Sequence, residues 1–200
     1  MNSRFANLPL HCHAAQPAGI STGHAAPVTG IAVSGSLDAA GLLELEYQLH
    51  GNLQQLLLPP GSGVGAHSAT RRDQLWRHTC LELFARAADS PGYLEFNFAP
   101  NGAWAAYEFD DYRAGQRSAE ASHCAVKVQR ESDHELQVRV SVLVPAMAST
   151  PRVATWQLGL AAVIEGSDGH LSYWALRHPR GPADFHDPAG FSYTLAAPAL

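Results

Sequence analysis

Apolar and polar residues alternate with a period of two along much of the chain. Over residues 43–49, leucine and tyrosine alternate with glutamate and glutamine. Over residues 136–144, leucine or valine stands at every second position, and Pro145 ends the run. Side chains of a strand point alternately to its two faces, so each run predicts a half-buried strand.

Further apolar runs with the length of strands follow one another along the chain. They lie at residues 28–33, 53–58, 75–85, 93–98, 103–109, 124–129, 156–164, 171–176 and 191–195. Segments rich in Gly, Pro, Asn and Asp connect them, and Asn101-Gly102 tolerates the positive φ values of a tight hairpin turn. No window of helical length shows a 3.6-residue period with capping residues.

These patterns predict an all-β fold, an antiparallel β-sandwich of about ten strands. We expect one domain over residues 28–200, because no internal repeat and no break in composition divides it. Residues 1–27, rich in Ala, Pro, Gly and His, are expected to form a loosely ordered lead-in. The Gly-rich loop over residues 59–72 is expected to be mobile.

Composition supports one globular unit and excludes several partners. Hydrophobic residues make up 46% of the 200 residues and charged residues 16%, with 4 Trp, 6 Tyr and 7 Phe to build a core. The formal net charge is −5, and Lys127 is the only lysine. We therefore expect no nucleic-acid partner.

The same sequence favours a cytoplasmic protein that does not enter a membrane. Residues 1–19 contain no continuous apolar core typical of a signal peptide, and no stretch approaches the ~18 apolar residues of a membrane span. Cys12, Cys80 and Cys124 form no C-x-x-C pattern, so we expect reduced thiols. We expect Cys80 to be a small buried residue.

The first segment that could carry chemistry is the run over residues 75–84. On an extended strand Trp76, His78, Cys80, Glu82 and Phe84 share one face. Trp76 and Glu82 would lie ~20 Å apart along such a strand. They can contact one ligand only if the strand bends or Trp76 precedes it. The alternative is that Trp76 packs in the core and Glu82 pairs with an arginine.

The second segment is the predicted hairpin over residues 93–109. Leu94, Phe96 and Phe98 are expected to enter the core, which leaves Tyr93, Glu95 and Asn97 on the opposite face. The Asn97 amide offers both a donor and an acceptor to a hydroxyl-bearing ligand. Exposure of these polar side chains to water is the alternative.

The third segment, over residues 171–188, ends in a loop stiffened by three prolines. His178, Asp184 and His186 are metal-ligand types, but their spacing matches no standard zinc pattern, so hydrogen-bonded structural roles are the alternative. Gly61-Ser62-Gly63 does not form a nucleophile elbow, and no phosphate-binding loop is present. The sequence therefore gives no strong case for an enzyme, and we expect no catalytic residues and no bound metal.

Together these segments resemble the bacterial DOMON-like proteins, which are related to family 9 carbohydrate-binding modules. The resemblance rests on Trp76 and Glu82 followed by Phe84, on the hairpin over residues 93–107, and on the Tyr-Trp-Ala-Leu-Arg-His-Pro segment over residues 173–179 with the Pro-x-Asp-Phe-His motif over residues 182–186. It spans residues 28–195 and implies a jelly-roll-like β-sandwich with a ligand site on a concave face. In this superfamily such sites bind sugars or haem.

The resemblance implies a sugar ring held between two tryptophans, Trp76 and Trp174, with Glu82 as the carboxylate that binds its hydroxyls. The wider set of candidate ligand-binding residues adds Asn97, Tyr107, Arg113, Arg177 and His178. Indole stacks on the apolar face of a pyranose, while carboxylate, amide and guanidinium groups bind its hydroxyls.

The leading hypothesis is thus a non-catalytic domain that binds a sugar, without a cofactor. One alternative is haem binding, although Met147 is the only methionine besides Met1 that could serve as an axial ligand. A second is a metal-dependent hydrolase that uses His178, Asp184 and His186. A third is a protein-binding patch formed by Trp76, Tyr107 and Trp174.

Overall fold

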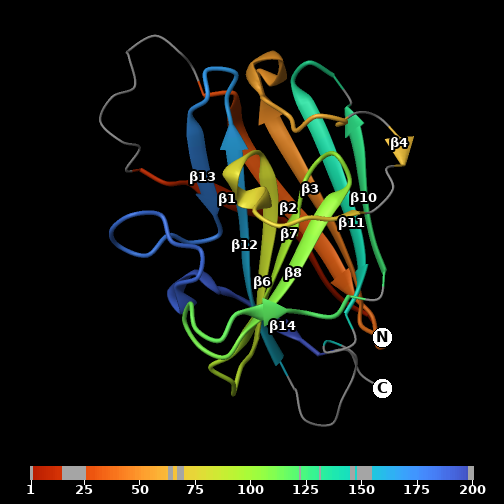
Figure 1. Ribbon diagram of the computed structural model, residues 1–200, viewed down its shortest axis with the longest axis vertical. Helices are drawn as coiled ribbons and strands as arrows, with labels where there is room; N and C mark the ends of the chain where they lie inside the picture. The colour runs from red at the N-terminus through yellow and green to blue at the C-terminus, as the bar shows by residue number, and fades with distance from the viewer. Residues whose placement is uncertain are drawn as a thin grey trace.

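A computed structural model describes residues 2–14, 26–62, 65–66, 70–121, 123–130, 132–144, 147 and 155–197. These residues form an almost entirely β structure, as the alternation predicts (Figure 1). Part of the loop over residues 59–72, expected to be mobile, lies outside the described residues.

The first half of the chain contributes β1 Ser3–Cys12, β2 Val28–Leu37, β3 Leu42–Gly51, η1 Leu53–Gln55, β4 Gly65–Ala66, β5 Thr70–Arg71, η2 Leu75–Arg77, β6 Cys80–Ala87 and β7 Tyr93–Phe98. The second half contributes β8 Ala103–Phe109, β9 Arg117–Ser118, β10 His123–Arg130, β11 Glu135–Leu143, β12 Thr155–Glu165, β13 Leu171–Ala175, η4 Pro188–Gly190 and β14 Tyr193–Ala196.

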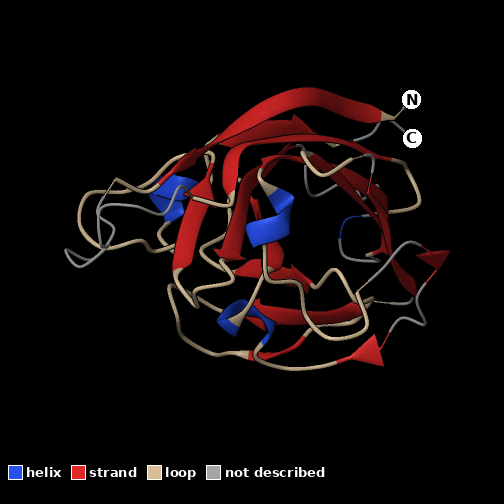
Figure 2. Cartoon of the chain, turned by 90° about the horizontal axis from the view of Figure 1, so that it is seen from above, coloured by secondary structure: helices blue, strands red, loops and turns tan. Residues whose placement is uncertain are grey.

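The strands form a β-sandwich of two sheets. The first sheet has the order β4-β10-β11-β3-β2-β1, and the second runs β13-β12-β6-β7-β8-β5, with β14 beside β12 and β9 beside β8. β1 joins the two because it pairs with β2 and, through its last residues, with β13. Seen from above, the strands curve around the interior in two facing layers (Figure 2). Among the described strands all pairs are antiparallel except β5 with β8.

Residues on the inner faces of both sheets build the main core. The alternation over residues 43–49 and 136–144 is confirmed, because Leu45, Tyr47 and Val140 are buried there. The Tyr47 hydroxyl donates a hydrogen bond of 2.9 Å to the backbone oxygen of Glu82 on the facing sheet. This contact ties β3 to β6 at the position where the candidate site lies. Met147, weighed above as an axial haem ligand, is fully buried in this core.

The N-terminal lead-in contains a strand that the sequence pattern did not predict. Residues 3–12 form β1, whose pairing with β2 shifts by a bulge between Phe5 and Leu8. Asn7 takes a positive φ of 53° inside the bulge. The extra residue breaks the period of two, so that Phe5 and Leu10 both point inward although they are five positions apart. The ordered structure therefore starts before residue 28, while residues 15–25 lie outside the described part.

Two other segments that were predicted as continuous strands have a different secondary structure. Residues 53–55 make the 3-10 turn η1, because the Asn52 side chain accepts a hydrogen bond from the Gln54 amide and starts the turn. The predicted strand over residues 75–85 is divided into η2 and β6. The hairpin turn at Asn101-Gly102 is confirmed, since Gly102 has a φ of 86° and Ala99 pairs with Ala103 across it.

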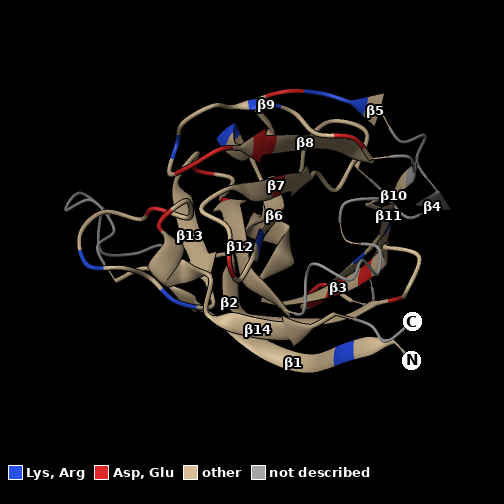
Figure 3. Cartoon of the chain, turned by 90° about the horizontal axis from the view of Figure 1, so that it is seen from below, with Lys and Arg blue, Asp and Glu red and all other residues tan. Residues whose placement is uncertain are grey.

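Acidic and basic residues are interspersed and lie mostly in loops and at sheet edges (Figure 3). Among the described residues no helix is long and apolar enough to cross a membrane.

Candidate functional site

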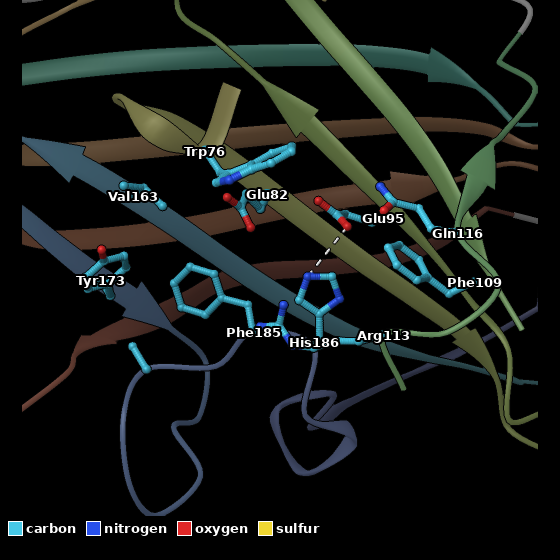
Figure 4. A pocket seen from close by; sticks show the side chains of 11 residues that line it. Trp76, Glu82, Glu95, Phe109, Arg113, Gln116, Val163, Tyr173, Phe185 and His186 are labelled. Atoms are coloured by element: carbon cyan, nitrogen blue, oxygen red, sulfur yellow. Dashed lines mark ion pairs between the residues drawn. The ribbon is translucent and has the colours of Figure 1, made fainter. Parts of the chain in front are cut away.

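A pocket of about 370 Å³ lies on the outer face of the second sheet, the face turned away from the main core. Strands β13, β12, β6, β7 and β8 form its floor, and η2 and the loop over residues 176–187 form its walls (Figure 4). Its lining side chains are Trp76, Glu82, Glu95, Phe109, Arg113, Gln116, Val163, Tyr173, Ala183, Phe185 and His186.

The floor of the pocket carries two carboxylates from neighbouring strands. Glu82 of β6 lies opposite Ala161 of β12 on one side and Asn97 of β7 on the other. Glu95 lies two residues before Asn97 on the same face of β7, and the Asn97 amide donates a 2.7 Å hydrogen bond to its Oε1. Because Ala161 is small, space remains above the sheet next to Glu82.

Both carboxylates are buried, at 3% exposure for Glu82 and 5% for Glu95. Burial raises the pKa of Glu82 well above its usual range, and the neighbouring Glu95 raises it further. Burial also raises the pKa of Glu95, opposed in part by the Asn97 hydrogen bond and by Arg113. Oε1 of Glu82 is enclosed and accepts no hydrogen bond from the described residues. An acceptor in this state is costly unless a ligand pairs with it.

Trp76 covers one side of the pocket from η2, just before β6 begins. Its side chain is 39% exposed, and its ring meets Tyr107 edge to face at a centroid distance of 6.3 Å. The Tyr107 hydroxyl donates a 2.6 Å hydrogen bond to Asp73, which lies two residues before η2. Trp76 therefore precedes the strand of Glu82, which meets the condition under which both side chains can contact one ligand.

The opposite wall is the loop after β13, which folds back across the sheet. His186 inserts between the rings of Phe84 and Phe109, each at a centroid distance of 5.2 Å. The backbone N–H of Arg113 donates to the Tyr93 hydroxyl at 3.2 Å, and that hydroxyl lies 2.8 Å from Nδ1 of His186. A hydroxyl that accepts from Arg113 can donate its own proton to Nδ1, so Nε2 of the neutral imidazole carries the hydrogen.

Nε2 of His186 faces Glu95, with 3.8 Å between Nε2 and Oε2 (Figure 4). Burial and the neighbouring Arg113 lower the pKa of His186, and Asp184 raises it in part, so that the pKa is about 4. His186 is therefore a neutral hydrogen-bond donor toward the acidic floor at neutral pH.

Arg113 stands at the rim, held by an acidic partner. Its guanidinium donates a 2.8 Å hydrogen bond to Oδ1 of Asp184, and the Tyr112 hydroxyl donates a 2.6 Å bond to Oδ2 of the same carboxylate. Oδ1 of Asp184 also accepts from the backbone N–H of His186 at 3.1 Å. Asp184 thus ties the loop after β8 to the loop after β13 and fixes the outline of the pocket.

Trp174, predicted to stack on the ligand opposite Trp76, does not reach the pocket. It lies in the main core at 5% exposure, and its indole N–H donates to the Ser172 hydroxyl at 3.1 Å. Adjacent residues on a strand face opposite sides, so Tyr173 lines the pocket instead. The predicted sandwich of two tryptophans is therefore wrong, and so is a surface patch that includes Trp174.

Of the other predicted ligand-binding residues, Glu82 and Arg113 line the pocket, while Asn97 and Tyr107 support it from behind. Arg177 and His178 lie in a different hollow, beside the end of β1. Nε2 of His178 donates to the backbone oxygen of His11 at 2.7 Å, so this side chain has a structural contact.

The structure does not bring His178, Asp184 and His186 together. His178 contacts His11, while Asp184 and His186 meet through the His186 backbone N–H, and within the described part of the chain no three His, Cys, Asp or Glu side chains are grouped to hold a metal ion. The described structure therefore does not support the metal-dependent hydrolase that was considered from the sequence.

Glu95, Tyr173 and Phe185 belong to the pocket although they were not among the predicted ligand-binding residues. A signal for Glu95 was present, since it shares a strand face with Asn97 within a strand otherwise made of aromatic residues and leucine. Tyr173 and Phe185 carry no comparable signal, because only the path of the loop after β13 brings Phe185 over the sheet.

The pocket thus combines an exposed indole with buried hydrogen-bonding groups. Trp76 offers a flat apolar face, and Phe185 and Tyr173 lie across the cavity from it (Figure 4). Glu82 and Glu95 offer acceptors, while His186 and Gln116 offer amide or ring N–H donors. This arrangement suits a small ligand with one apolar face and several polar groups at its edge.

Comparisons with known proteins agree with the fold. No protein-family model and no curated protein matches the chain. Among solved structures, it is similar to a candidate carbohydrate-binding protein from Bacteroides uniformis, with 16% identity, a TM-score of 0.55, and coverage of 84% of this chain and 79% of that one. A family 9 carbohydrate-binding module from Caldicellulosiruptor kristjanssonii, in complex with cellotriose, gives 8% identity, a TM-score of 0.49, and coverage of 89% and 75%. The Bacteroides structure and the strand order of this chain establish the β-sandwich fold.

Proposed function

We propose that the pocket on the second sheet binds the ring of a small carbohydrate without catalysing a reaction on it. The observation that carries the proposal is one cavity lined both by a partly exposed indole, Trp76, and by a buried carboxyl group, Glu82, whose Oε1 has no donor among the described residues. A pyranose ring supplies what both groups lack. Its C–H face covers the indole while a hydroxyl donates to Glu82.

The size and lining of the cavity also support a sugar. About 370 Å³ accommodates one or two rings of that kind, at the small end of typical ligand pockets of ~300–1,000 Å³. The similarity to the candidate carbohydrate-binding protein from Bacteroides uniformis is consistent with this proposal. A relation to the DOMON-like proteins is part of the same proposal. We favour sugar over haem because Met147 lies in the main core, away from the pocket.

The test is a titration of the purified protein with a panel of monosaccharides and disaccharides. Binding is followed by tryptophan fluorescence and by calorimetry. We expect at least one sugar to bind with a one-to-one stoichiometry and to change the fluorescence of Trp76. If no sugar in the panel binds at millimolar concentration, the proposed function is wrong.

A further inference from the structure

The two carboxyl groups on the floor of the pocket, Glu82 and Glu95, have too few positively charged neighbours to neutralise both. The groups that face Glu82 are Cys80 on its own strand, Glu95 and Asn97 from β7, and Ala161 from β12. The thiol and the amide carry no charge, and Glu95 is a second acid. None of these neighbours can balance an ionised Glu82.

The two basic side chains among the residues that line the pocket, Arg113 and His186, already have other partners. The Arg113 guanidinium pairs with Asp184 at 2.8 Å. His186 receives its hydrogen bond from Tyr93 and turns Nε2 toward Glu95. Glu95 therefore has Asn97 and His186 as partners, whereas Oε1 of Glu82 has no donor among the described residues.

The protein can tolerate this imbalance by keeping a proton on Glu82. Burial raises the pKa of Glu82, and the charge of Glu95 raises it further. The proton then serves as the counter-charge that the surrounding side chains do not provide. A ligand that brings a positive charge to the same place can replace that proton and gain the full interaction with the carboxylate.

We propose that the sugar bound in this pocket carries a primary amine, and that its ammonium group lies against the Glu82 carboxylate below Trp76. This inference rests on the proposed function and names the substrate class. An ammonium group supplies three N–H donors, whereas a hydroxyl supplies one. Charge-assisted hydrogen bonds are also roughly twice as strong as neutral ones.

Trp76 adds to the preference for a cation. The face of an indole attracts a positive charge within about 6 Å of its ring, so an ammonium group between the ring and Glu82 interacts with both. An acidic sugar would meet two carboxylates at the floor, and the only guanidinium among the lining residues is paired with Asp184. The pocket therefore selects against anionic sugars and for cationic ones.

The experiment compares sugars that differ only by the amine. Glucose, galactose and mannose are titrated by calorimetry beside derivatives with an amine at C2, C3 or C6 and beside their N-acetyl forms, at pH 6.5. We expect one amino sugar to bind at least tenfold more tightly than both its neutral parent and its N-acetyl form. Raising the salt concentration should weaken that binding and leave the neutral sugars unchanged.

Variants locate the preference within the pocket. Glu82→Gln keeps the size of the side chain and removes its charge, so the tenfold preference should fall to about unity. Glu44→Gln is the matched control, since Glu44 is an exposed glutamate on β3 of the first sheet, and the preference should remain. Circular dichroism and thermal unfolding verify that both variants fold. If Glu82→Gln fails to fold, the affinities of the wild-type protein for the amino sugar and for its parent sugar still test the inference.

The outcomes separate the two proposals. If neutral sugars bind as tightly as amino sugars, the inference on the amine is overturned and the proposed function stands. The inference also fails if folded Glu82→Gln keeps the preference. If no sugar of any kind binds, the proposed function itself fails. Methylammonium serves as the charge-only probe, and binding as tight as that of the amino sugar would overturn the requirement for a sugar ring.

Discussion

Replacing Trp76 with alanine should weaken sugar binding strongly while the fold remains intact. The ring is 39% exposed and packs on Tyr107 at the edge of the sheet, so it belongs to the surface of the pocket more than to the core. Stacking of a flat ring on an aromatic side chain contributes about 1–3 kcal/mol in nucleic-acid complexes. The same magnitude here corresponds to a loss of about 5- to 150-fold in affinity.

The cost to stability should be smaller than for a buried tryptophan. A Trp side chain buries about 150–250 Å² when fully covered, so the covered part of Trp76, which is 39% exposed, contributes about 2–4 kcal/mol. Trp174 is almost completely buried, and Trp174→Ala should cost about 3–5 kcal/mol through loss of packing and formation of a cavity. The milder Trp174→Phe is the better control because it keeps an aromatic ring in the core.

The assay pairs calorimetric titration of the best sugar from the panel with urea unfolding of each variant. We expect Trp76→Ala to lose affinity while it remains folded, and Trp174→Phe to lose stability with unchanged affinity in the folded fraction. The reverse outcome would refute the reasoning. In particular, a folded Trp174→Phe that no longer binds would restore the predicted sandwich of the two tryptophans.

Three further predictions concern stability and titration. Folding raises the pKa of Glu82, so ionisation of Glu82 destabilises the native state as pH rises. Glu82→Gln should therefore unfold at a higher urea concentration than wild type at pH 8, and at the same urea concentration at pH 4. His186 has a lowered pKa of about 4, so its contribution to stability should be lost as pH falls from about 6.5 to 4; NMR titration of its ring should find no protonation at pH 5.5. Gly159→Ala should destabilise by about 1–3 kcal/mol in urea unfolding, since the added Cβ would lie 2.7 Å from the Phe191 ring; an unchanged midpoint would show that the ring moves freely.

The sequence predicts the strands best where one face packs on the core and the other meets solvent. β3 and β11 are of this kind, and their alternation of apolar and polar residues gives both their position and the side that they bury. The same reasoning does not predict β1, because the bulge at Asn7 changes which of its alternate residues face the core. A β-bulge of this kind is only weakly indicated by the amino-acid sequence.

The second sheet is harder to interpret because several of its strands are covered on both sides. All six residues of β7 are buried, so its hydrophobic pattern does not separate the core face from the pocket face. In β13 the local sequence likewise does not determine whether Tyr173 or Trp174 faces the pocket. That choice depends on parity relative to the neighbouring strands, which is fixed by pairing such as Trp174 with Ala162 and not by the local sequence.

A carboxylate within a strand that is buried on both sides is the more informative signal. Glu82 and Glu95 each stand in such a strand, and each is expensive to bury without a charged partner or hydrogen bonds. Antiparallel pairing of β6 with β7 then places them on one face, two positions apart in register. The pocket face of the second sheet is therefore marked in the sequence by these two acids more reliably than by its tryptophans, because an aromatic residue fits the core as well as a pocket, whereas a buried acid without a charged partner does not fit the core.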